Sequence, residues 1–257
     1  MWKMFQTVSE PGSLRDPLLI VCLSTSNPEY KVLYSQGREL GRFLLKKLGF
    51  ELFSSLYSSA LPPEVKVSNK GVGNLASNNF YVYHGEKRDY ILLAGHSSPI
   101  EEQYEYGDVV LSYAQKLGVK ELVSFGARWT ETVLPPLDIP KLTGYANDEE
   151  GTKLLEEAGI SIQRNESAYY FANIITSQSK FYGIRGYKIS VDHGEPAPNP
   201  KSIIAFLGIL GKMFGLKIDD SDLHTQAREL DESMRKAAIE GVSDDGNKDS
   251  QNDDIYR

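Results

Sequence analysis

Cysteine and clustered histidine are nearly absent from this sequence. The single cysteine, Cys22, lies in the apolar run LLIVCL, so no intramolecular disulfide can form and we expect a buried thiol. The four histidines, at positions 84, 96, 193 and 224, are far apart and none has a second ligand at metal-binding spacing. We therefore expect no metal, no cofactor and a reducing compartment.

Long apolar runs and blocks of basic residues are missing too. No run approaches the roughly 18 apolar residues that cross a bilayer, and the first 17 residues lack the apolar region of a signal peptide. We expect a cytoplasmic protein without a membrane partner. The 35 acidic residues outnumber the 28 basic ones, and no segment is rich in lysine and arginine. Nucleic acid is therefore not an expected partner.

What the sequence does contain is an alternation of strand and helix patterns. Residues 18–23 are apolar on both faces, which is typical of a central parallel strand covered by helices. Asn27, Pro28 and Glu29 are helix-start signals and predict a helix from there to about Gly49. Short β-rich runs between 50 and 94 predict a meander that joins or flanks the sheet.

The alternation resumes after residue 100. We predict helices over 101–117, 148–158, about 171–181 and 200–214, and strands over 119–125, 141–146, 160–163 and 186–192. Repeated β-then-α order predicts an α/β fold, a three-layer sandwich with a mixed, mostly parallel sheet, which we assign to residues 1–217.

The last part of the chain differs in composition. In 218–241, apolar residues recur every three or four positions on an otherwise charged helix, at Leu223, Ala227, Leu230, Met234 and Ala237. This stripe packs either on its own subunit or on a neighbouring one. Residues 242–257 are acidic and have no apolar periodicity, so we predict a disordered tail.

A catalytic constellation is hard to find. His96 and Ser97 follow a predicted strand in GHSSP, but this is not the G-x-S-x-G elbow of serine hydrolases. GVGNLA, residues 71–76, matches a dinucleotide-binding pattern, yet an aromatic strand follows it and no helix. We therefore expect no catalytic residue. A ligand in a cleft at the strand ends would contact His96, Ser97 and Arg128.

The C-terminus, DDIYR, raises a different possibility. Ile255 and Tyr256 end a segment in which five aspartates and the terminal carboxylate outweigh Lys248 and Arg257. Apolar and aromatic surface on a solvated segment is typical of a binding motif that another surface receives. The alternative is a chance ending of a frayed terminus.

Four segments carry a resemblance to a known family: RDPLLIVCLS, RDYILLAGHSSPIEEQYEYGDVVLSYAQKLGVKELVSFGA, KLTGYANDEEGTKLLEEAGI and GYKISVDHGEPAPNPKSIIAFLGILGKMFG. In order and character they resemble the proteasome assembly chaperone 2 family, particularly its archaeal homo-oligomeric members. The sequence departs from that pattern at STSNPEY, where many relatives have a glycine-rich loop, and at SFGARWT, where paired glycines are common.

The resemblance implies an α/β fold like that of nucleoside phosphorylases and hydrolases, without established catalysis. It implies a homo-oligomer that binds the α-ring of the proteasome core particle as an assembly chaperone, an activator or both. It also implies that Ile255, Tyr256 and Arg257 form the family's terminal hydrophobic-Tyr-X motif. The alternatives are a small-molecule enzyme of the phosphorylase or hydrolase type and an oligomeric scaffold with an incidental tail.

Overall fold

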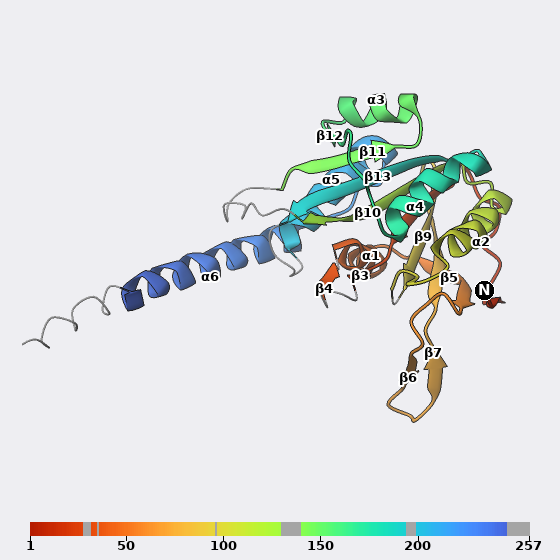
Figure 1. Cartoon of the computed structure of the whole chain (residues 1–257), viewed down its shortest axis with the longest axis horizontal. Helices are drawn as coiled ribbons and strands as arrows, with labels where there is room; N and C mark the ends of the chain where they lie inside the picture. The colour runs from red at the N-terminus through yellow and green to blue at the C-terminus, as the bar shows by residue number, and fades with distance from the viewer. Residues whose placement is uncertain (28–31, 35, 96, 130–139, 194–198, 246–257) are drawn as a thin grey trace, which may run out of the picture.

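A computed structural model shows how the chain folds (Figure 1). It describes residues 1–27, 32–34, 36–95, 97–129, 140–193 and 199–245. A nine-stranded sheet with the strand order β1-β5-β8-β9-β2-β10-β13-β11-β12 lies between two layers of helices. The predicted α/β fold with a mixed sheet and a parallel centre is confirmed.

The strands of the sheet are β1 (Lys3–Thr7), β2 (Leu18–Cys22), β5 (Glu51–Ser58), β8 (Asn78–His84), β9 (Asp89–Gly95), β10 (Glu121–Trp129), β11 (Leu142–Ala146), β12 (Ser161–Ile162) and β13 (Arg185–His193). The central strands β9, β2, β10 and β13 are parallel. Strands β1, β5 and β8 extend the sheet in antiparallel order on one side, and β11 pairs antiparallel with β13 on the other.

Two hydrophobic cores lie on the two faces of this sheet. Helices α1 (Gln36–Lys47), α3 (Glu149–Glu157) and α5 (Pro200–Phe214) contribute to one core. Helices α2 (Gln103–Lys116) and α4 (Phe171–Gln178), which continues into the 3₁₀ turn η1 (Ser179–Tyr182), contribute to the other. Strand β2 supplies Ile20 to the first core and Leu19 to the second, and both side chains are fully buried. A strand with two buried faces needs apolar residues at every position, which explains the run LLIVC.

The predicted start of the first helix is wrong. The helix begins at Gln36, and the preceding segment contains two short strands, β3 (Thr25–Asn27) and β4 (Val32–Tyr34). These strands pair with each other antiparallel, with Thr25 opposite Tyr34 and Asn27 opposite Val32. Cap signals act only on neighbouring backbone groups, and here strand pairing uses the backbone groups that the helix would have needed.

A second short ribbon extends from the body (Figure 1). Strands β6 (Val65–Val67) and β7 (Gly73–Leu75) form a two-stranded sheet of their own, outside the main sheet, and every residue in them is exposed. Val65 lies opposite Leu75, and Lys66 lies opposite Asn74. Because strand residues alternate between faces, one face of the ribbon is apolar and the other polar.

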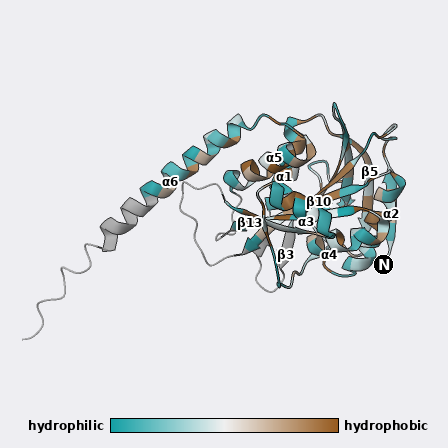
Figure 2. Ribbon diagram, turned by 90° about the horizontal axis from the view of Figure 1, so that it is seen from above, coloured by the Kyte–Doolittle hydropathy of each residue, from teal (hydrophilic) through white to brown (hydrophobic). Residues whose placement is uncertain are grey.

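The final helix, α6 (Ser221–Asp245), extends away from the body and continues past the predicted end at Gly241 (Figures 1 and 2). Its first turns are anchored: Leu223 and Ala227 are buried in the core that α5 shares. Asp231 then accepts a hydrogen bond from Lys201 on α5, with 2.6 Å between Nζ and Oδ1. Leu230 and Met234, farther along the predicted stripe, are only half-buried. The proximal part of the stripe therefore packs on its own subunit, whereas Ala237 lies beyond the described side chains.

Across the described residues, no helix has the length and apolar character needed to span a bilayer.

Candidate functional site

The segment after β9, which contains the predicted site residues His96 and Ser97, is held by a buried asparagine. The Nδ2 atom of Asn78 donates hydrogen bonds to the Ser97 carbonyl oxygen at 3.0 Å and to the Tyr106 hydroxyl at 2.8 Å. Burial raises the pKa of Tyr106. Ser97 itself is only 7% exposed, and its Oγ has no hydrogen-bond partner in the described part of the chain. A side chain so enclosed is poorly placed to attack a substrate in solvent. His96 lies outside the described residues.

Arg128, the third predicted cleft residue, is held by two carboxylates at the end of β10. Its Nε and Nη2 donate to Asp192 at 2.9 and 3.2 Å, and its Nη1 donates to Glu166 at 3.1 Å. The hydrogen bond to Asp192 is the main cause that raises the pKa of Arg128. An anionic ligand would have to compete with both carboxylates. The described hydrogen bonds place Ser97 and Arg128 in separate clusters.

A buried lysine, which the sequence analysis did not single out, lies on the same sheet face as Arg128. Lys188 on β13 is 4% exposed, and its Nζ donates to the Ser190 Oγ at 2.8 Å and to the Ile189 carbonyl at 3.2 Å. No carboxylate of the described residues forms an ion pair with it. Burial lowers its pKa from 10.5 to about 7. This amine therefore loses its proton near neutral pH, far below the usual range for lysine.

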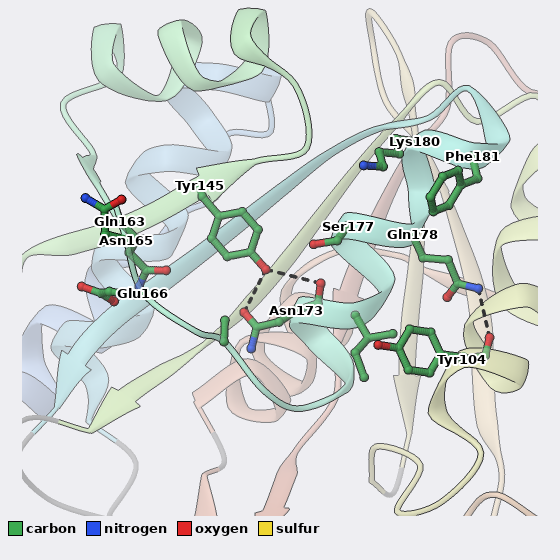
Figure 3. Close-up of a pocket in the computed structure, with 12 residues that line it drawn as sticks. Tyr104, Tyr145, Gln163, Asn165, Glu166, Asn173, Ser177, Gln178, Lys180 and Phe181 are labelled. Carbon is green, nitrogen blue, oxygen red and sulfur yellow. Dashed lines mark hydrogen bonds between the residues drawn. The ribbon is translucent and has the colours of Figure 1, made fainter.

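A cavity of about 630 Å³ opens beside α4, between α2 and β11 (Figure 3). The Tyr145 hydroxyl donates to the Asn173 Oδ1 at 3.1 Å, and the Gln178 Nε2 donates to the Tyr104 carbonyl at 3.0 Å. Burial raises the pKa of Tyr145. Tyr104 and Phe181, on the side opposite Gln163 and Asn165 in the view, are 66% and 77% exposed.

Backbone strain also occurs at this cavity. Asn165 in its lining and Tyr170 at the start of α4 have φ angles of 56° and 73°. Such angles are uncommon for residues other than glycine, and they often occur at binding sites. Amide groups and exposed aromatic rings suit contact with a protein or another neutral polar surface.

The terminal residues Ile255, Tyr256 and Arg257 lie outside the described residues. What the structure describes is α6, which leads toward them and ends at Asp245. Within the described ranges, no group of three or more His, Cys, Asp or Glu side chains could hold a metal ion.

Comparison with known proteins relates this fold to one family. The model of the PAC2 family matches residues 37–238. The chain belongs to the PAC2 family. Among solved structures it is similar to PbaB of Pyrococcus furiosus, described as an archaeal proteasome activator, with a TM-score of 0.77 and 19% identity over 92% of this chain and 98% of that one.

Two further structures have the same fold. PbaA of Pyrococcus furiosus, an archaeal homolog of proteasome-assembly chaperone, has a TM-score of 0.68 and 19% identity, covering 91% of this chain and 96% of that one. A proteasome-assembly chaperone homologue of Mycobacterium tuberculosis has a TM-score of 0.70 and 17% identity, covering 85% and 94%. No curated protein matches this chain significantly. At these identities the likeness to solved structures establishes the fold, and the family match establishes the relationship.

Proposed function

We propose that this PAC2-family protein is a non-enzymatic, cytoplasmic protein that binds the proteasome core particle, as an assembly chaperone, an activator or both. The similar structures described as a proteasome activator and as proteasome-assembly chaperone homologues support this role. The observation that carries the proposal is the chain's ending: Ile255, Tyr256 and Arg257 follow an acidic segment, beyond a helix that extends from the body.

The terminal residues would dock in pockets between neighbouring subunits of the core particle's α-ring. The terminal carboxylate would form a charge-assisted hydrogen bond with a basic side chain, while Ile255 and Tyr256 fill apolar walls. Arg257 would contribute mainly its backbone carboxylate. Residues 246–254 would span at most about 30 Å when extended, so the motif can reach a pocket that the folded body does not touch.

A single docked tripeptide binds weakly, because ordering a free chain end offsets much of the contact energy. Several tails on one homo-oligomer would raise the overall affinity by orders of magnitude. The half-buried Leu230 and Met234 on the extended part of α6 give a neighbouring subunit an apolar stripe to pack against. We therefore propose a homo-oligomer with several tails.

The enzymatic alternative receives no support from the predicted cleft residues. Ser97 is enclosed and Arg128 is engaged by two carboxylates. Neither Ser97 nor Arg128 therefore forms part of a nucleophile–base pair that is open to solvent.

The test is a pull-down of purified core particle with the full chain and with two variants. Deletion of residues 255–257, or Tyr256→Ala, should abolish binding and leave the thermal unfolding temperature unchanged. Lys248→Ala is the matched control, because it alters the same tail and keeps the last three residues. Faster peptide hydrolysis by the core particle would identify an activator, whereas accelerated particle assembly alone would identify a chaperone. Full binding by the truncated chain would refute the proposal.

A further inference from the structure

A second cavity, of about 300 Å³, lies at the carboxyl ends of β2 and β9, between α1, β8 and the β6–β7 ribbon. Cys22, Ala94 and Gly95 contribute to its lining. Helix α1 lies close to these strands because residue 41 is glycine: a Cβ there would stand 2.8 Å from the Cβ of Cys22. In α/β proteins with parallel strands, ligands bind preferentially at this end of the strands.

Three cationic side chains line the cavity. Arg38 and Arg42 lie one turn apart on α1, and Lys66 comes from the β6–β7 ribbon. Arg42 forms an ion pair with Glu39, with 2.8 Å between Nη1 and Oε1. Arg38 forms no ion pair with any of the described residues. Two guanidinium groups at positions i and i+4 repel each other, and an anion between them would relieve this repulsion.

The polar groups of Ser77 and of β8, which follows it, add a further donor. The Ser77 hydroxyl donates to the Asn79 Oδ1, and the Asn79 Nδ2 donates to the Tyr81 hydroxyl oxygen, both at 3.2 Å. All three residues line the cavity. The Tyr81 hydroxyl oxygen accepts the hydrogen bond from Asn79, so the hydroxyl hydrogen of Tyr81 remains available for donation. This hydrogen has no acceptor in the described part of the polypeptide. Among the described residues, the cavity lining therefore combines three cationic side chains and a free hydroxyl donor with no carboxylate.

We propose that this cavity is a binding site for a small phosphate-bearing molecule, such as a diphosphate or the phosphate ester of a small sugar. Arginine and lysine provide the donors that phosphate oxygens prefer, and Arg38, which has no ion-pair partner among the described residues, can form a paired hydrogen bond. The cavity volume exceeds that of a single phosphate group and leaves room for a second phosphate or a sugar ring. This site is separate from the C-terminal motif and does not depend on the proposed function.

The test is isothermal titration calorimetry of the full chain with sodium diphosphate, with ribose 5-phosphate and with sodium sulfate. Diphosphate or ribose 5-phosphate should bind at least tenfold more tightly than sulfate, and higher salt should weaken binding because the site is open to solvent. Arg38→Gln should weaken binding of the preferred phosphate compound about ten- to a hundredfold, since it removes a hydrogen bond between charged groups. Tyr81→Phe, which removes one hydroxyl, should weaken it about tenfold.

Arg164→Gln is the matched control. It makes the same change of charge at an exposed arginine paired with Glu156, next to β12 at the opposite edge of the sheet. It should leave phosphate binding unchanged, and circular dichroism should show that all variants are folded. The proposal is overturned if neither phosphate compound binds, or if the Arg38→Gln variant binds phosphate as tightly as the Arg164→Gln variant. It is also overturned if sulfate binds as tightly as the phosphate compounds, because that result would indicate an adventitious ion only.

Discussion

Replacing Lys188 with methionine should stabilise the protein near neutral pH. Lys188 is buried, and no carboxylate of the described residues pairs with it. The fall of its pKa from 10.5 to about 7 means that burial disfavours the charged form in the folded state by a free energy of about 5 kcal/mol. Methionine has a similar length and carries no charge, so the substitution removes this cost. It also leaves the Ser190 Oγ without its partner at 2.8 Å, which costs about 1–3 kcal/mol. The expected net gain is about 2–4 kcal/mol.

The gain should depend on pH in a defined direction. The unfolded chain keeps the lysine proton up to about pH 10.5, whereas the folded chain loses it near pH 7. Between these values the unfolded state binds more protons, so the wild-type free energy of unfolding rises with pH, by about 1.4 kcal/mol for each pH unit. The advantage of Lys188→Met is therefore largest below pH 7 and shrinks toward pH 9.

Urea unfolding followed by far-ultraviolet circular dichroism at pH 6, 7.5 and 9 measures both effects. Lys201→Met is the contrasting control, because Lys201 is also buried but pairs with Asp231 at 2.6 Å. Removing one partner of a buried ion pair leaves the other charge uncompensated, so Lys201→Met should destabilise the protein, by up to about 3 kcal/mol. The reasoning fails if Lys188→Met is less stable than wild type at pH 6, or if its advantage does not change with pH.

Three further substitutions test the packing. Asn78→Ala removes a fully buried side chain that donates to the Ser97 carbonyl and the Tyr106 hydroxyl, and urea unfolding should show a loss of about 2–4 kcal/mol; wild-type stability would contradict this role. Leu223→Ala should loosen the attachment of α6, so hydrogen exchange should accelerate over 221–236 and stay unchanged in the central strands. Gly41→Ala should lower the thermal unfolding temperature, because the new Cβ would clash with Cys22 on β2. Helix propensity alone predicts a higher unfolding temperature for alanine, and that result would refute the close contact.

Helix α5 shows what the sequence could predict. Asn199 accepts a hydrogen bond from the Lys201 backbone N–H through its Oδ1 at 2.9 Å, Pro200 occupies the first turn, and the helix ends at Phe214 as predicted. These signals depend on neighbouring residues only. The same kind of signal at Asn27 failed, because pairing between β3 and β4 is a contact that cap chemistry does not encode.

Strand β13 shows why the polar sites were harder to predict. Its apolar residues, such as Ile189, alternate with Lys188, Ser190 and Asp192, a pattern typical of a half-exposed strand. The polar face is nevertheless covered, because α4 packs over β13 and β10. Burial of Lys188 is thus a property of the tertiary arrangement. The proposed phosphate site also depends on the tertiary arrangement. In the sequence, Arg38 and Arg42 have the spacing of a solvent-exposed helix face, and only the fold places Lys66 of the β6–β7 ribbon at the same cavity.

The attachment of α6 has a mechanical consequence. Among the described hydrogen bonds and ion pairs between α6 and α5, the one at Asp231 is the most distal, and Asp245 lies 14 positions beyond it. At 1.5 Å per residue this part of the helix is about 21 Å long, so tilting by about 10° at Asp231 would displace its end by about 4 Å. Small changes in a few side-chain contacts on α5 would therefore redirect the far end of α6 while the sheet stays still.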